Sequence, residues 1–262
     1  MPAALFLTSP LLDLGLFLLG LIVGSFLNVV IHRLPRGLSI VRPRSRCPAC
    51  ETPIPAHLNV PVVSWLVLRG RCAACGAPIS PRYPAVEAAT ALLFVASGRL
   101  DGPTLHLPFH LAFIATLITV ALIDLDFQII PNELSIGGLV VGLAHAAIAG
   151  AFKDALVGAA LGSGILWGIG ALYFAVRKIE GMGGGDVKLA AMLGAFLGWK
   201  GILLTIFFSS FVGAFVGVLL MRLRGSGGQT RVPYGTFLAP AAIFVLFLGD
   251  PILGAYFRML AR

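Results

Sequence analysis

The sequence predicts an all-α integral membrane protein of about eight transmembrane helices, with a small polar insertion between the first and second helices. Of its 262 residues, 58% are hydrophobic and only 11% are charged, and the mean hydropathy is +0.97. A soluble domain normally carries about 25% charged residues. The apolar residues gather in long runs, and all four cysteines fall in one polar stretch. These observations together exclude an ordinary soluble globular domain.

The apolar runs give the expected helix positions, because about 20 apolar residues match the thickness of the hydrocarbon core. Helices are predicted over residues 11–31, 84–98, 105–123, 134–149, 155–176, 187–197, 201–221 and 235–253. The second, fourth and sixth of these helices are short. No Lys or Arg precedes the first run, and the basic segment from His32 to Arg36 follows it. We therefore expect an uncleaved first helix rather than a signal peptide.

Basic residues indicate the orientation of the chain in the membrane. The insertion, residues 32–83, contains eight Arg and a single acid, Glu51. If the insertion is cytoplasmic, about three quarters of all Lys and Arg residues lie inside, as the positive-inside rule requires. Both termini are then outside, and the loops near residues 124–133, 177–188 and 222–231 are inside. The insertion lacks interleaved aromatic residues, so no nucleic-acid partner is expected.

Glycine spacing within the predicted helices indicates close helix packing. The patterns Gly20-x-x-x-Gly24 and Gly213-x-x-x-Gly217 place small residues on one helix face. In lipid, small residues of this kind let two helix backbones approach each other. We take these glycines as a packing signal without catalytic meaning.

The cysteines form two motifs with the same CxxC spacing, Cys47-Pro-Ala-Cys50 and Cys72-Ala-Ala-Cys75, separated by twenty-one residues. This spacing predicts one tetrahedral Zn²⁺ site. Four sulfur ligands leave no open coordination position, so the zinc is expected to be structural. Two disulfides or a redox pair are the alternatives. A cytoplasmic location disfavours stable disulfides, and no βαβ pattern surrounds either motif.

Four acids lie at the inside ends of apolar runs: Asp124, Asp126, Glu133 and Asp186. Ionisable groups beside hydrocarbon are costly and usually functional. The glycine-rich segment before Asp186 is no phosphate-binding loop, because the GxxxxGK[ST] pattern is absent. It could instead let another chain approach closely. Asp186 could also serve only as a helix N-cap.

Asp124 and Asp186 are predicted to face each other from different helices on the same side of the membrane. Two close carboxylates share a proton, so that one acts as a base and the other as an acid on a water molecule. An ion-coupled transporter with a proton relay is the main alternative, although it would place acids near helix midpoints. A membrane-anchored zinc scaffold is another, and it leaves the acids unexplained.

Several segments resemble the bacterial type IV prepilin peptidases, a family of GxGD-type aspartic peptidases. Gly183-x-Gly185-Asp186 matches the GxGD signature. Both cysteine motifs match as well, and so do the segments 24–35, 59–66 and 69–72 and the pattern Arg82-Tyr83-Pro84-x-x-Glu87. The resemblance covers nearly the whole chain.

The resemblance implies an enzyme of the bacterial cytoplasmic membrane that removes a basic leader from type IV prepilins or pseudopilins of pilus and type II secretion systems. It also implies N-methylation of the new terminus with S-adenosylmethionine. Asp186 carries over as catalytic, and Asp124 is preferred over Asp126 as the second aspartate.

The expected domains are a first helix (1–31), a cytoplasmic zinc insertion with a methyltransferase role (32–83) and a transmembrane peptidase core (84–262). The roles of Glu87 and Lys188, the methyl-transfer residues, the particular pilin and the oligomeric state stay open.

Overall fold

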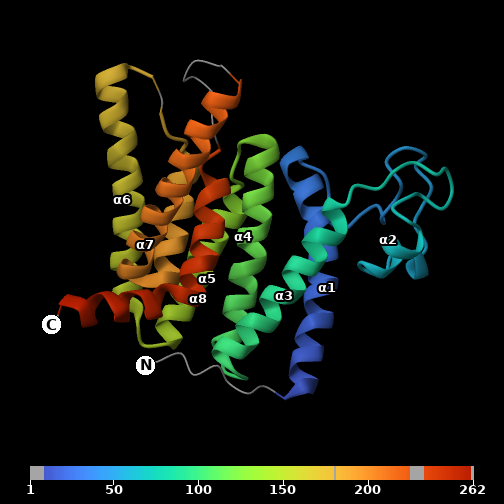
Figure 1. Ribbon diagram of the computed structural model, residues 1–262, viewed down its shortest axis with the longest axis horizontal. Helices are drawn as coiled ribbons and strands as arrows, with labels where there is room; N and C mark the ends of the chain where they lie inside the picture. Colours follow the sequence, from blue (N-terminus) through green and yellow to red (C-terminus); the bar gives the residue numbers. More distant parts are fainter. Residues whose placement is uncertain (1–8, 180, 225–232, 261–262) are drawn as a thin grey trace. The chain divides into compact units, whose positions relative to one another are not determined.

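A computed structural model describes residues 9–179, 181–224 and 233–260 (Figure 1). This part of the chain is helical and has no strand, only isolated bridges between Arg46 and Pro53 and between Arg71 and Pro78. The all-α prediction is therefore confirmed. The α-helices are α1 (Pro10–Arg33), α2 (Val63–Val67), α3 (Arg82–Asp101), α4 (Leu107–Phe127), α5 (Asn132–Ile148), α6 (Phe152–Arg177), α7 (Gly184–Arg224) and α8 (Gly235–Leu260).

The chain divides into two compact units, Leu5–Leu107 and Pro108–Arg262. The first contains α1, the cysteine insertion with its short helix α2, and α3. The second contains nearly all of α4 and the whole of α5 to α8. The expected boundary between residues 83 and 84 falls at the start of α3, whereas the packing divides the chain after Leu107. The roles assigned to the predicted domains stay predictions.

In the first unit, α1 and α3 run side by side, with the insertion at one end of the pair (Figure 1). Gly20 packs against the backbone of Ala91. A Cβ atom on Gly24 would lie 2.7 Å from Cα of Glu87. Neither glycine could therefore carry a side chain at this helix spacing. The packing role predicted for the first glycine pair is confirmed.

The core of the second unit forms where α4, α6, α7 and α8 meet. Its fully buried side chains are Phe113, Leu117, Val120, Leu166, Leu189, Met192, Leu193, Ile202 and Leu238. The second predicted glycine pair contributes less to packing. A Cβ atom on Gly213 would lie 3.6 Å from the Phe237 ring, and one on Gly217 would meet no described atom within 4 Å. Only Gly213 lies at a helix contact.

Helix α7 is a hairpin of two helices rather than one straight rod. Its backbone turns at Gly198, where φ is +68° and ψ is 179°. A Cβ atom on Gly162 of α6 would lie 2.6 Å from the Ala190 carbonyl oxygen and 2.7 Å from Ile202 Cγ1. In a straight helix these two residues would be about 18 Å apart. The separate helices predicted over 187–197 and 201–221 therefore exist as the two arms of α7.

Five described helices are long and apolar enough to cross a membrane: α1, α4, α6, α7 and α8. Large apolar side chains stand exposed on them, such as Trp167 at 67% and Phe211 at 68%. Such surfaces suit lipid and not water. The chain is thus a multi-pass membrane protein. The expected eight crossings stay a prediction, since α5 is shorter and α3 is less apolar. Much of the predicted inside loop 222–231 lies outside the described residues.

Candidate active site and metal centre

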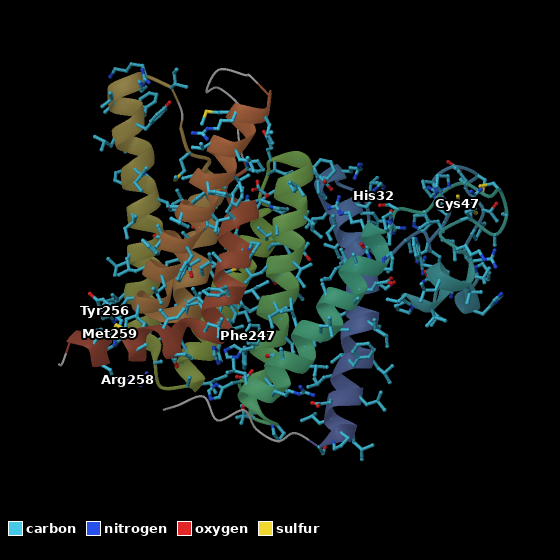
Figure 2. All side chains as sticks on the ribbon, in the orientation of Figure 1. His32, Cys47, Phe247, Tyr256, Arg258 and Met259 are labelled. Atoms are coloured by element: carbon cyan, nitrogen blue, oxygen red, sulfur yellow. The ribbon has the colours of Figure 1, made fainter. Side chains whose placement is uncertain are left out.

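The four cysteines of the insertion converge on one point. Cys47, Cys50, Cys72 and Cys75 place their sulfur atoms within 4.8 Å of one another, and Cys47 lies in the insertion beyond the end of α1 (Figure 2). The Sγ atoms of Cys47 and Cys75 are 3.9 Å apart. Tetrahedral Zn–S bonds of about 2.3 Å place sulfur atoms about 3.8 Å apart. The cluster therefore has the dimensions of a tetrathiolate metal site.

Both cysteine motifs fold into the same kind of turn. The N–H of Cys47 bonds to the carbonyl of Thr52, and the N–H of Cys72 bonds to the carbonyl of Ala77. The residue after each motif is left-handed, with φ of +58° at Glu51 and +71° at Gly76. Glycine tolerates this conformation, whereas glutamate adopts it at a cost. The matched turns bring the two sulfur pairs together.

The chemistry of these thiols fits a metal better than disulfides. All four cysteines are free, and the sulfur atoms form one cluster instead of two bonded pairs. Hydrogen bonding to Thr52, whose Oγ1 is 3.3 Å from Cys50 Sγ, lowers the pKa of the Cys50 thiol to about 6. Metal ligation requires thiolates. The donor set therefore fits Zn²⁺, as the sequence predicts.

Asp124 lies in the last turns of α4 and is only 4% exposed. Its Oδ2 atom accepts the backbone N–H of Thr236 at 2.8 Å, and the Thr236 hydroxyl lies 3.3 Å away. This carboxylate therefore caps the start of α8, a position where a negative charge is favourable. The cap fixes the direction of the Asp124 side chain.

Asp186 lies in the first turn of α7, directly after the glycine-rich segment. Its backbone N–H donates to the Gly183 carbonyl at 3.1 Å, so the glycines wrap around the helix start. Its Oδ1 atom is buried and has no hydrogen-bond partner among the described residues. A buried carboxylate oxygen without a partner is costly. This atom is therefore available to a water molecule or a substrate.

The two aspartates meet at the start of α8. Their charges are close enough to interact, and Gly235 packs directly against the Asp124 carboxylate. Asp126 and Glu133 are exposed, unlike the buried Asp124. The structure thus places Asp124 beside Asp186. Two carboxylates close enough to interact form a site that can hold and activate a water molecule.

Two features of this site are absent from the sequence prediction. The first is the turn before α8, because a Cβ atom on Gly235 would lie 2.9 Å from Asp124 Oδ2. The second is Ile130, which contacts both the Gly185 and the Gly235 positions. A glycine that opens the last apolar helix on the inside edge was the available signal. Lys188, whose role stayed open, donates to Asn132 Oδ1 at 2.8 Å.

Comparison with known proteins gives two family matches. The "Bacterial Peptidase A24 N-terminal domain" matches residues 18–99, and the "Type IV leader peptidase family" matches residues 111–218. No solved structure shows a significant match.

Similar curated proteins carry the name "Prepilin leader peptidase/N-methyltransferase". The protein from Myxococcus xanthus is 47% identical over 222 residues, which cover 84% of this chain and 66% of the relative. Those from Pseudomonas aeruginosa and Aeromonas hydrophila are 41% and 40% identical, and each alignment covers 92% of both chains. This chain therefore belongs to the type IV leader peptidase family.

Proposed function

We propose that this protein is an aspartic endopeptidase of the bacterial cytoplasmic membrane that removes the basic leader of type IV prepilins or pseudopilins. Its active site opens on the cytoplasmic side, and the protein also N-methylates the new terminal residue. The observation that carries the peptidase proposal is that Asp124 and Asp186 lie close enough for their charges to interact, with a buried, unpartnered oxygen on Asp186. The printed names of its relatives support both activities.

The two carboxylates divide the work of peptide hydrolysis. One takes a proton from a water molecule, whose oxygen attacks the scissile carbonyl carbon. The other gives its proton to the leaving nitrogen as the C–N bond breaks. The leader gains a carboxylate and the pilin gains an amine. The carboxylate that acted as base is now protonated, and the one that acted as acid has lost its proton. Thr236 and Gly235 hold Asp124 in place during these transfers.

The exposed segment before Asp186 suits the entry of a peptide backbone. Gly183 and Gly184 are exposed, and a Cβ atom on Gly184 would meet nothing within 4 Å. Asp126 and Glu133 add negative charge at nearby helix ends. The chain has a net charge of +8, which on its own repels a basic leader. The acids near the site instead attract the leader locally.

Two further groups fit this proposal. The four cysteines would hold Zn²⁺, which supplies a cross-link to an insertion with little apolar core. S-adenosylmethionine, when bound, supplies an electrophilic methyl group to the pilin amine. No residue of the peptidase site is needed for that second reaction.

A direct test uses purified protein in detergent, a prepilin precursor and S-adenosylmethionine. Mass spectrometry of the pilin reports leader removal and the added methyl group in one measurement. We expect both changes in the wild-type reaction and only leader removal when the methyl donor is left out. An intact precursor after prolonged incubation with folded, zinc-loaded protein would contradict the peptidase proposal and favour the transporter alternative.

A further inference from the structure

The first unit holds a cavity of about 660 Å³ between α1, α3 and the cysteine insertion. Ligand pockets usually measure about 300–1,000 Å³. All of its lining residues lie between Ser25 and Glu87, so one unit builds the whole cavity. His32, near the end of α1, and Cys47, in the insertion, are both lining residues (Figure 2).

The lining combines three kinds of group. Arg33, Arg42 and Arg46 supply positive charge, while Trp65 and Tyr83 supply flat aromatic surfaces. The indole N–H of Trp65 donates to the Ile79 carbonyl at 3.0 Å, which fixes the ring. Among the described lining residues, Glu87 is the one acid.

Glu87 is an unusual residue for a helix that packs tightly against its neighbour. It is 7% exposed, and its Oε2 atom accepts the Val62 N–H at 2.7 Å. Ser25 lines the cavity on the facing helix α1. Among the described residues, Glu87 has no ion-pair partner. A buried carboxylate without a cation is costly, so its retention in a cavity wall points to a cationic ligand.

The backbone beside Glu87 supports the same conclusion. Val62, which donates to its carboxylate, has φ of +60° and ψ of −50°. A β-branched residue pays a clear energetic cost for positive φ. Such strain gathers at functional sites, where the surrounding structure enforces a fixed geometry. The strained Val62 therefore holds the Glu87 carboxylate in one position.

We propose that this cavity binds the methyl donor and that Glu87 faces its cationic centre. The inference rests on the proposed methyl transfer and assigns it a site. S-adenosylmethionine combines a flat adenine ring, a carboxylate and two cationic groups, the sulfonium and the ammonium. The cavity offers aromatic faces for the ring, Arg side chains for the carboxylate and one acid for a cation. Glu87 is thus the residue that distinguishes the charged donor from its neutral thioether product.

Binding titrations can test this assignment without measuring activity. Full-length protein in detergent would be titrated calorimetrically with sinefungin, which carries an amine near the sulfonium position, and with S-adenosylhomocysteine, a neutral thioether there. We expect Glu87→Gln to weaken sinefungin binding about tenfold or more, and S-adenosylhomocysteine binding much less. Gln keeps an oxygen for the Val62 N–H. Asp250→Asn, which changes an exposed acid of α8 that does not line the cavity, should leave both affinities unchanged.

A second measurement avoids any dependence on the variant's stability. Ultraviolet cross-linking of radiolabelled S-adenosylmethionine to the wild-type protein, followed by peptide mapping, should label peptides from residues 25–87. Labelling confined to the Pro108–Arg262 unit would overturn the assignment, as would equal affinities of Glu87→Gln and wild type for both ligands. If the pilin is still methylated, either result rejects this cavity as the donor site without contradicting the proposed methyl transfer. A cleaved but unmethylated pilin and a wild-type protein that binds neither ligand would instead refute the methyltransferase proposal itself.

Discussion

Asp124 accepts the backbone N–H of Thr236 at 2.8 Å, although 112 positions separate the two residues in the chain. The end of α4 is thereby tied to the start of α8 by the same carboxylate that we propose for catalysis. A substitution at Asp124 can therefore act through stability or through chemistry. The choice of replacement separates these two effects.

Asp124→Asn should abolish cleavage while the protein still folds. The amide oxygen can still accept the Thr236 N–H, but it cannot take a proton from water. Loss of general acid–base catalysis should lower the rate about 10²–10⁴-fold. Asp124→Ala should lose the cap as well and unfold at a lower temperature. Cleavage kinetics and detergent melting curves distinguish the two variants.

Asp186→Asn should be as inactive as Asp124→Asn, and the double variant should be scarcely worse, because members of a catalytic unit act non-additively. The matched control is Asp126→Asn, which alters an exposed acid of α4, the helix that carries Asp124, and should retain cleavage. An inactive Asp126→Asn with an active Asp124→Asn would reassign the first aspartate. Normal cleavage by Asp186→Asn would remove the aspartic mechanism altogether.

Gly235→Ala should reduce cleavage without changing zinc content. The added methyl group would lie 2.9 Å from Asp124 Oδ2 and 2.9 Å from Ile130 Cδ1, closer than ordinary contact. The carboxylate must then shift from the position in which it accepts the Thr236 N–H. Gly137→Ala is the control, since its Cβ would meet nothing within 4 Å. Equal cleavage rates for both variants would show that the turn before α8 does not position Asp124.

Zinc should be bound at about one ion per chain and should be lost on acidification. Hydrogen bonding lowers the pKa of the Cys50 thiol to about 6, whereas its neighbouring thiols raise the pKa of Cys75 to about 11. Zinc ligation requires all four thiolates, so protons compete with the metal increasingly as the pH falls. Metal analysis after dialysis against a chelator at pH 7.5 and pH 5 would measure this. We expect the Cys75→Ser variant to lose the metal at both pH values. Metal-free wild type with four reactive thiols would contradict the zinc assignment.

Gly198→Ala should destabilise the second unit by about 1–3 kcal/mol, because φ of +68° with ψ of 179° is a conformation that essentially only glycine adopts. The added methyl group would also press on the Asp154 carboxylate. Gly164→Ala in α6 provides the control, because its Cβ would face open space. Chemical denaturation in detergent should show a lower midpoint for the first variant alone. Identical midpoints would mean that the turn of α7 tolerates a side chain.

The sequence predicts local features of this protein better than its long-range contacts. Apolar runs locate the helices because lipid demands continuous apolar length, and the repeated CxxC spacing predicts that the four cysteines gather at one point. The number of crossings is less certain, since short or less apolar helices such as α3 and α5 carry weak signals. Gly20 and Gly24 are identified as packing residues because only glycine permits that approach.

The contacts that complete the site could not be predicted in the same way. Thr236 and Gly235 are ordinary residues at a helix start, and only the fold shows that they meet a carboxylate from α4. Ile130 lies in a short connection with no pattern of its own. The position of Val62 beside Glu87 likewise depends on how the insertion folds back on α3. Such pairings arise from tertiary packing, and the periodicity of apolar residues in the sequence does not reveal them.

The division of the chain after Leu107 has a kinetic consequence. Both aspartates belong to one unit, whereas the proposed donor cavity belongs wholly to the other. Leader removal creates the amine that methyl transfer needs, so the two reactions run in that order. Cleaved, unmethylated pilin should accumulate early in a time course and decline later, and its peak should rise as the methyl donor is made scarce. The enzyme would thus behave as two catalysts in series, whose balance the cell could set through its supply of methyl groups alone.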